Sequence, residues 1–170
     1  MNDLPDSAAP PSADATSSFY RNHLSHRAGF LIRRLHQIHL SLFAEECADF
    51  GVTPVQYSIL TVAAVHPDID QASLGHEVGV DRATLANVIA RLKAHGLISR
   101  SKKATDRRVN LIRVTARGSA VLAQMDGAAQ RAHERTVAAL PENERALFIS
   151  YLSYLVEAGN EHGRAPLRIG

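Results

Sequence analysis

Several features that mark whole classes of proteins are scarce in this 170-residue sequence. It has a single cysteine, Cys47, which excludes an intrachain disulfide framework and any zinc finger built on cysteines. No apolar run approaches the roughly 18–20 residues that cross a bilayer, and residues 1–18 lack the basic start and apolar centre of a secretory signal. We therefore expect a cytoplasmic chain without a membrane partner.

Motifs of the common enzyme classes are also missing. The sequence contains no G-x-S-x-G, H-E-x-x-H, G-x-x-x-x-G-K-[ST] or G-x-G-x-x-G. A catalytic function would have to assemble scattered His and Asp residues without a motif, so we expect a protein that is not an enzyme and has no cofactor. Turnover of an aromatic acid would revive the enzymatic alternative.

Cys47 itself has two interpretations. In a helical stretch it is typical of a small buried apolar residue, whereas a peroxide-sensing thiol needs a lowered pKa. Three acidic residues, Glu45, Glu46 and Asp49, lie close to it in the sequence. Because nearby negative charge opposes formation of the thiolate, the buried structural role is favoured.

Charge is distributed unevenly along the chain. The whole sequence carries a net charge of +2, but residues 81–117 contain ten Lys or Arg and only two acids, a net charge of +8. The remainder is therefore acidic, at −6. This pattern is typical of a polyanion-binding surface on an acidic body, although a basic run can also be a solvated face.

Apolar spacing predicts two helices in the first part of the chain. One spans about residues 25–50 and ends at Gly51. Its apolar residues recur at helical intervals: Leu24, Leu31, Leu35, Ile38 and Leu42. Thr53 followed by Pro54 is a helix-start signal, because threonine caps the first amides and proline fits the first helical position. The second helix is predicted over 54–65, before His66-Pro67.

Two shorter helices and a hairpin follow. The helices are predicted over 71–78 and 82–95, with Gly79 in the turn and Asp81 as the N-cap of the second, which is a helix-turn-helix arrangement. Residues 97–99 are predicted as a short strand, 102–108 as a charged connection and 109–114 as the returning strand. A hairpin directly after such a helix pair is a wing.

Two long helices, about 116–140 and 141–157, complete the pattern, and Thr115 caps the first. Their apolar stripes exceed what a small winged domain covers, which favours pairing with a second copy. The predicted fold class is mainly α with a small β-wing: a winged helix-turn-helix with N- and C-terminal dimerisation helices. The expected segments are a disordered leader (1–18), an N-terminal dimerisation helix (19–50), a DNA-binding winged helix-turn-helix (51–114), C-terminal dimerisation helices (115–160) and a tail (161–170).

Three spaced motifs resemble the MarR family (multiple-antibiotic-resistance regulators). Residues 106–118, DRRVNLIRVTARG, are similar to its wing signature of Asp and Arg, an apolar strand and Leu-Thr-x-x-Gly, with Val114 in place of Leu. Residues 51–57 look like its Gly-Leu-Thr-x-x-Gln segment, and residues 92–98 look like Leu-x-x-x-Gly-Leu-Ile. The resemblance covers about residues 25–158. It implies an obligate homodimer, usually a repressor, whose DNA binding responds to a small molecule or to redox chemistry.

Within this resemblance, the helix at 82–95 is expected to enter the major groove of double-stranded DNA. Arg82, Thr84 and Asn87 project from its first turns; Arg can recognise guanine and Asn adenine, while Thr84 could instead contact phosphate or cap the helix locally. Arg91 is expected on phosphate. Small Ala83 and Ala86 allow close approach.

The wing carries Lys102, Lys103, Arg107 and Arg108. By similarity to the family's Asp-x-Arg motif, Arg108 is expected in the minor groove, with Arg107 on phosphate and Asp106 bracing an arginine of the wing. Two-fold symmetry predicts a palindromic operator with half-sites roughly 10 bp apart.

A mixed flank on the first helix predicts a ligand pocket that faces the second helix. The candidate residues share polar or aromatic character suited to an aromatic carboxylate: Ser25, Arg34, His36, His39 and Tyr57. The run 31–37 resembles the family branch that senses aromatic catabolites, so the expected effector is a small aromatic acid that releases the repressor. An aromatic coenzyme A thioester, oxidants or zinc remain alternatives, as does an ordinary surface or interface role for each histidine.

Two further alternatives stay open. His36-x-x-His39 has a spacing that could bind a metal, but two ligands are too few, so no metal site is predicted. A winged helix without sequence preference is separated from a specific regulator by competition with unrelated DNA at fixed salt.

Overall fold

The computed structural model describes residues 24–163, so the predicted leader (1–18) and most of the predicted tail lie outside the described residues. The described residues form two compact units, which meet in the sequence between Ile38 and His39. Helix α2 (Ala28–Glu46) is followed by a single 3₁₀ turn, η1 (Ala48–Phe50). We expected one continuous helix to about residue 50; instead, Gly51 closes the 3₁₀ turn in the left-handed conformation, with φ of 61°.

Helix α3 (Pro54–Val65) has the bounds that the sequence predicts. The side chain of Thr53 accepts a hydrogen bond from the backbone N–H of Gln56, and the Gln56 side chain accepts one from the Thr53 N–H at 2.9 Å. These reciprocal bonds satisfy two amides that have no partner inside the helix. Gln56 is thereby paired although it is buried.

Helices α4 (Gln71–Val78) and α5 (Arg82–Ala94) begin with the same local arrangement. At each start, one carboxylate oxygen of the capping aspartate, Asp70 or Asp81, accepts from two backbone amides at 3.0 Å. The other oxygen accepts from a hydroxyl three residues later, Ser73 or Thr84, at 2.6 Å. Gly79, in the left-handed conformation, ends α4. The predicted helix-turn-helix and its Asp81 cap are confirmed.

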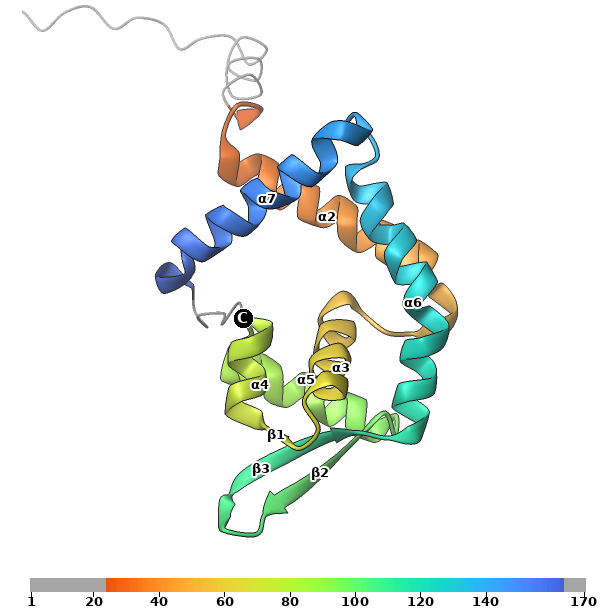
Figure 1. Cartoon of the computed structure of the whole chain (residues 1–170), viewed down its shortest axis with the longest axis vertical. Coiled ribbons are helices and arrows are strands. Elements are labelled where there is room, and N and C mark those ends of the chain that lie inside the picture. The colour runs from red at the N-terminus through yellow and green to blue at the C-terminus, as the bar shows by residue number, and fades with distance from the viewer. Residues whose placement is uncertain (1–23, 164–170) are drawn as a thin grey trace, which may run out of the picture. The chain divides into compact units, whose positions relative to one another are not determined.

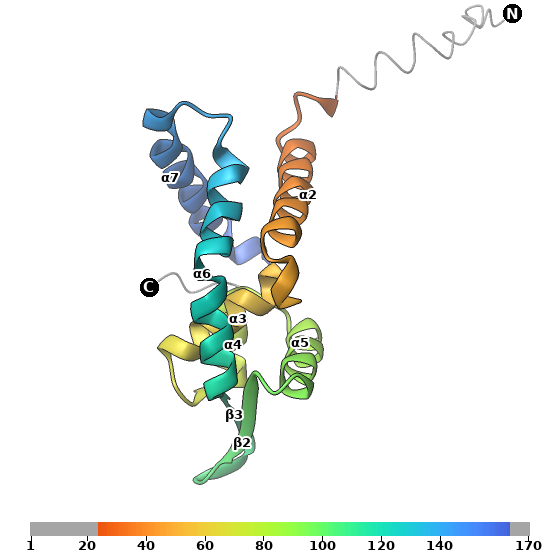
Figure 2. The same cartoon turned by 90° about the vertical axis from the view of Figure 1, so that its right-hand side faces the viewer.

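The hairpin is longer than the sequence predicts. Strands β1 (Ile69–Asp70), β2 (Ile98–Lys103) and β3 (Asp106–Val114) form an antiparallel sheet in the order β1-β3-β2. Figures 1 and 2 show β2 and β3 extending as a ribbon beyond helices α3–α5. The prediction of a charged connection over residues 102–108 is wrong. The two strands are longer than predicted, and only residues 104 and 105 connect them. A register shift occurs between Lys102 and Lys103.

Helix α6 (Ala116–Val137) is joined to the wing through a close backbone junction. The Thr115 hydroxyl donates to the Gly96 carbonyl at 2.7 Å and accepts from the Gly118 N–H at 3.1 Å. The Thr115 N–H donates to the Leu97 carbonyl at 3.0 Å. Gly118 lies so close to Leu97 that a Cβ at position 118 would be 2.1 Å from the Leu97 carbonyl oxygen.

The core of the second unit lies between α3, α4, α5, the sheet and α6. Its largest fully buried side chains are Phe43, Ile59, Leu60, Leu74, Ile89, Leu92, Ile112 and Met125. Helix α7 (Glu142–Ala158) contributes no buried residue to this core, and a short 3₁₀ turn, η2 (Asn160–His162), follows it. The predicted fold class, mainly α with a small β-wing, is confirmed. No helix among residues 24–163 is both long and apolar enough to span a bilayer.

Replacing Gly118 with alanine tests the junction. The added methyl overlaps the Leu97 carbonyl, so Gly118→Ala should lower the free energy of unfolding by about 1–3 kcal/mol, as overpacking typically does. Chemical denaturation measures the change. Gly127→Ala is the matched control on the same helix, because its Cβ would meet only the end of the Arg131 side chain at 3.7 Å. That control should be neutral or stabilising by up to about 1 kcal/mol. Equal effects of the two substitutions would contradict the junction.

Candidate nucleic-acid interface

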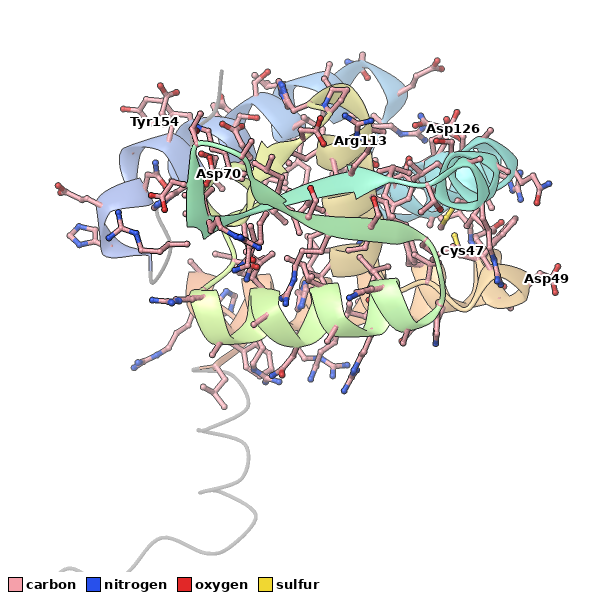
Figure 3. The ribbon with its side chains drawn as sticks, turned by 90° about the horizontal axis from the view of Figure 1, so that it is seen from below. Cys47, Asp49, Asp70, Arg113, Asp126 and Tyr154 are labelled. Atoms are coloured by element: carbon pink, nitrogen blue, oxygen red, sulfur yellow. The ribbon has the colours of Figure 1, made fainter. Side chains whose placement is uncertain are left out.

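Helix α5 presents one buried and one exposed face. Leu85, Val88, Ile89 and Leu92 are buried, and they fix which side of the helix faces outward. The outward side carries Arg82, Asn87 and Arg91 together with small residues, Ala83, Ala86 and Ala90. Figure 3 views this end of the molecule and shows nitrogen-bearing side chains projecting from α5. The arrangement combines donors for base edges with a backbone that can approach DNA closely.

Thr84 is held by the helix cap. Its hydroxyl donates to the Asp81 carboxylate at 2.6 Å, which uses its only hydrogen as a donor. The oxygen retains acceptor capacity, but the side chain is oriented toward the start of its own helix. Of the two roles considered for Thr84 in the sequence, the geometry favours the local cap over direct contact with a base.

The wing tip is organised by an ion pair. Arg108 Nε and Nη2 donate to the two carboxylate oxygens of Asp106 at 3.1 and 3.2 Å, and the Arg108 N–H donates to the same group at 3.0 Å. These bonds from Arg108 hold the pKa of Asp106 below its usual value. The expectation that Asp106 braces a wing arginine is confirmed. The Arg108 side chain is still 92% exposed, and Lys102, Lys103 and Arg107 are exposed beside it.

Arg113 has a different partner. Its guanidinium forms a two-point ion pair with Asp68: Nε lies 2.9 Å from Oδ1, and Nη2 contacts Oδ2. The hydrogen bond from Arg113 holds the pKa of Asp68 below its usual value. Asp68 has a positive φ of 60°, unusual for a residue other than glycine, so this pair fixes a strained turn just before β1. In Figure 3, Arg113 lies across the sheet from α5.

A second group of polar and aromatic side chains lies within the second unit, between the end of α2, α3 and α6. His39 Nδ1 is hydrogen-bonded to the Thr136 hydroxyl at 2.9 Å, and its ring stacks on His133 with centroids 5.1 Å apart. The Phe43 ring lies 5.9 Å from Tyr57 and 6.4 Å from His133. We call these residues, with Asp126, the imidazole–aromatic cluster.

Tyr57 extends this cluster toward α6. Its hydroxyl donates to the Asp126 carboxylate at 3.4 Å. Burial, with the neighbouring Asp126 charge, raises the pKa of Tyr57, so the phenol keeps its proton at neutral pH. The structure therefore joins two predicted ligand residues, His39 and Tyr57, through Phe43 and His133. His133 and Thr136 were missed because they lie almost one hundred residues away in the sequence.

The other predicted ligand residues, Ser25, Arg34 and His36, belong to the first unit. There, Arg34 Nη1 donates to the Gln37 side chain at 2.9 Å, one turn along α2. The Arg33 guanidinium lies over the Phe30 ring, 5.2 Å from its centroid. Their role in a pocket stays a prediction.

Cys47 is only 2% exposed and belongs to the core. Burial, with the adjacent Glu46 charge, raises the pKa of the Cys47 thiol. Figure 3 marks it beside α6, where Glu46 accepts from Arg131 at 2.8 Å and from Arg135 at 2.7 Å. Burial of Cys47 and the adjacent Glu46 charge both oppose formation of the thiolate that a peroxide sensor requires.

Among residues 24–163, no group of three His, Cys, Asp or Glu side chains lies closely enough together to hold a metal ion.

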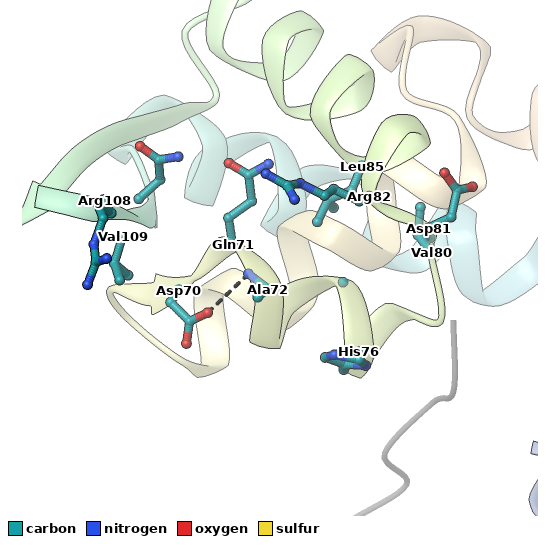
Figure 4. Close-up of a pocket in the computed structure, with 12 residues that line it drawn as sticks. Asp70, Gln71, Ala72, His76, Val80, Asp81, Arg82, Leu85, Arg108 and Val109 are labelled. Atoms are coloured by element: carbon teal, nitrogen blue, oxygen red, sulfur yellow. Dashed lines mark hydrogen bonds between the residues drawn. The ribbon is translucent and has the colours of Figure 1, made fainter. Parts of the chain in front are cut away.

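A cavity of about 550 Å³ lies between α4, the start of α5 and strand β3. Figure 4 shows Gln71 reaching from α4 into the space between Arg82 and the strand that carries Arg108 and Val109. The remaining lining includes Asp70, Asp81 and Asn110. No residue of this cavity was predicted as a ligand site, although Arg82 and Arg108 were predicted to contact DNA.

The sequence of this chain matches a known protein family and several of its members. Residues 52–109 match the sequence model of the MarR family. The chain is 31% identical over 126 residues to the transcriptional regulator HosA of Escherichia coli, an alignment that covers 74% of this chain and 92% of HosA. It is 28% identical over 140 residues to the HTH-type transcriptional repressor NicR of Pseudomonas putida, with 82% of this chain and 89% of NicR covered.

Solved structures agree. One match is Bordetella bronchiseptica BpsR, whose DNA binding is regulated by 6-hydroxynicotinic acid, with a TM-score of 0.74, 28% identity and coverage of 78% of this chain and 95% of BpsR. Another is the repressor CouR bound to a 23-mer DNA duplex, with a TM-score of 0.73, 25% identity and coverage of 78% and 94%. The chain spans nearly the full length of these regulators and shares their helices and wing, and it therefore belongs to the MarR family of DNA-binding transcriptional regulators.

Proposed function

We propose that this protein is a homodimeric repressor that binds a palindromic operator and is released by a small aromatic acid. The observation that carries the proposal is the joint exposure of α5 and the wing: an amphipathic helix with Arg82 and Asn87 on its outer face stands beside a ribbon whose tip carries Arg108. The surrounding basic residues are exposed as well: Arg91, Lys102, Lys103 and Arg107.

The DNA complex follows from the shapes of the grooves. A helix fits the major groove, where Arg82 and Asn87 meet base edges, and Arg91 meets phosphate. The narrow ribbon suits the neighbouring minor groove, where negative potential is concentrated and favours an inserted Arg108. Asp106 orients that guanidinium before binding, which reduces the conformational entropy lost on docking.

Dimerisation is supported by the surface of α7. Six of its large apolar side chains are between 48% and 69% exposed: Leu147, Ile149, Tyr151, Tyr154, Leu155 and Val156. Three of them, at positions 147, 151 and 155, form one stripe along the helix. An apolar stripe of this size favours association, and the partner we propose is a second copy of the chain. Two-fold symmetry then places two α5 helices about one turn of DNA apart.

The imidazole–aromatic cluster is the proposed effector site. Phe43 and Tyr57 offer aromatic surface, and His39 and His133 offer imidazole groups that can bind a carboxylate. The regulation of BpsR by 6-hydroxynicotinic acid supports an aromatic acid of this kind. Ser25, Arg34 and His36, which belong to the first unit, stay ligand residues predicted from the sequence. A coenzyme A thioester of such an acid is the alternative within the same chemistry.

Operator binding tests the interface. Arg108→Ala should weaken binding by about tenfold and lower the magnitude of the salt slope by about two, because each protomer loses one cationic contact worth roughly 0.9 of slope. Fluorescence anisotropy over a salt series measures both quantities. Arg113→Ala is the control on the same strand: it removes the same charge, but its guanidinium is held by Asp68, so the slope should change little. Equal slopes for all three proteins would refute the wing assignment.

Effector binding tests the cluster. A ligand that binds only the native state at about 100 times its Kd contributes about 2.7 kcal/mol, which should raise Tm by roughly 5–10 °C. Thermal shift with 6-hydroxynicotinic acid, benzoates, cinnamates and their thioesters identifies the ligand. His39→Ala should lose the shift, whereas His66→Ala, which removes an exposed imidazole outside the cluster, should keep it. Equal shifts in both variants would exclude this site.

Thiol reactivity tests the oxidant alternative. Because Cys47 is buried and its pKa is raised, its reaction with a disulfide reagent at about pH 8 should be at least about a hundredfold slower in native protein than in guanidinium chloride. Cys47→Ala should bind the operator with unchanged sensitivity to peroxide. Rapid labelling of the native protein, or release by peroxide that disappears in Cys47→Ala, would restore a redox switch.

A further inference from the structure

Two side chains that line the cavity between α4, α5 and β3 each carry an oxygen atom that lacks a hydrogen-bond partner within residues 24–163. The side-chain oxygens Gln71 Oε1 and Asn110 Oδ1 are both buried, and neither has a hydrogen-bond partner among the described residues. Both residues line the cavity. A buried polar group without a partner costs stability, and such groups are rare in folded proteins. Because no partner in the described part of the chain holds either oxygen, each amide group in the cavity lining keeps its freedom to turn and present its N–H donors.

The position of the cavity identifies the class of occupant. Its two sides are the first turn of α5, proposed to enter the major groove, and the strand that leads to the wing tip, proposed to enter the minor groove. On duplex DNA these grooves are separated by one sugar-phosphate strand. Whatever lies between a helix in one groove and a wing in the next is therefore that strand.

The chemistry of the lining fits a phosphodiester. A phosphate offers only acceptors, and an amide side chain offers two N–H donors. No hydrogen bond from the described residues holds Gln71 Oε1 or Asn110 Oδ1 in place. Rotation about the last side-chain torsion can therefore exchange the oxygen and the NH₂ group without breaking a hydrogen bond to that oxygen. Either amide can thus present donors to a phosphate that enters the cavity.

The two carboxylates of the lining do not oppose this occupant strongly. Asp70 already accepts from Ala72, Ser73 and the Ser73 hydroxyl, and these bonds hold its pKa low. Asp81 is engaged in the same way at the start of α5. Arg82 and Arg108 belong to the same lining, and Arg82 brings a positive charge to it, whereas the Arg108 guanidinium is paired with Asp106.

We infer that Gln71 and Asn110 are positioning residues that hold the DNA strand between the two grooves by donating their amide hydrogens to its phosphate. This inference rests on the proposed function, because it assumes that α5 and the wing occupy adjacent grooves. The contact fixes the register of the protein on the duplex and carries no sequence information.

Anisotropy titrations over a salt series test the inference. The probes are a duplex of about 30 bp selected by the wild-type protein from random sequences, and an unrelated duplex of equal length. Gln71→Ala and Asn110→Ala should each weaken binding by about tenfold on both duplexes, since hydrogen bonds to charged groups are the stronger kind. The specificity ratio and the salt slope should not change, because a neutral amide displaces no cation. Tm should not fall, since each substitution removes an unpaired buried atom.

Isosteric variants keep the test independent of folding. Gln71→Glu and Asn110→Asp preserve shape but repel phosphate, so they should bind more weakly than the alanine variants. Gln130→Glu makes the same charge change at an exposed position of α6, and it should have little effect on DNA binding. Three results would overturn the inference. The Gln71→Ala/Asn110→Ala double variant could keep the wild-type affinity, lose affinity for the selected duplex only, or show a fall in Tm that accounts for its loss of affinity. If Arg108→Ala weakens binding while the double variant does not, the proposed function stands and this contact alone fails. A wild-type protein that selects no duplex refutes both.

Discussion

The DNA-reading surface depends on one backbone junction at the start of α6. There the end of α5, the first residue of β2, the last residue of β3 and the first turn of α6 converge. Thr115 bonds to the backbone of Gly96 and Leu97, and Gly118 allows α6 to approach Leu97 at a distance that no side chain permits. Helix and wing are therefore fixed relative to each other by short covalent and hydrogen-bonded paths. The proposed contact with two grooves at once needs this rigidity, because an error of orientation at the junction is magnified at the wing tip.

Charged residues in the basic segment serve two distinct purposes. Arg113 is paired with Asp68 and stabilises the turn that begins the sheet. Arg108 is oriented by Asp106, but its side chain remains exposed to solvent. The two pairs look alike in sequence, since each joins one Asp to one Arg. The two pairs differ in the sequence separation of their members. Asp106 is two residues from Arg108, so this pair shapes the ribbon locally, whereas Asp68 and Arg113 connect separate elements. Counting basic residues therefore overstates the charge available to DNA.

Local capping chemistry explains which elements were predictable from sequence. The bounds of α3 and α4 and the start of α5 agree with expectation, because Thr53, Asp70, Asp81 and Gly79 act within three residues of the helix ends that they define. The ribbon was underestimated because β2 is exposed on both faces beyond Ile98, so it lacks the apolar alternation that reveals a strand. The end of α2 was misplaced because a 3₁₀ turn continues its apolar pattern.

The candidate sites divide in the same way. The residues predicted to contact DNA follow one another along α5 and the wing, so periodicity and charge suffice to propose them from the sequence. The His39 partners, His133 and Thr136, come from the far end of α6 and depend on tertiary packing that no local pattern encodes. Gln71 and Asn110 are unremarkable in sequence, and only the cavity between them gives them significance.

Helix α6 connects the proposed effector site to the reader. The imidazole–aromatic cluster meets it at His133 and Thr136, and the wing junction meets it at Gly118, about 22 to 27 Å away along a helix that rises 1.5 Å per residue. Between these points, Glu46 is bonded to both Arg131 and Arg135, which fixes α6 against the end of α2. In the proposed function, a ligand that separates His39 from His133 shifts α6 relative to the end of α2. We propose that this shift reaches the Thr115–Gly118 junction and changes the spacing of the two α5 helices in the dimer. Release of DNA then needs no disorder in the reader, only a half-site spacing that no longer matches the turn of the duplex.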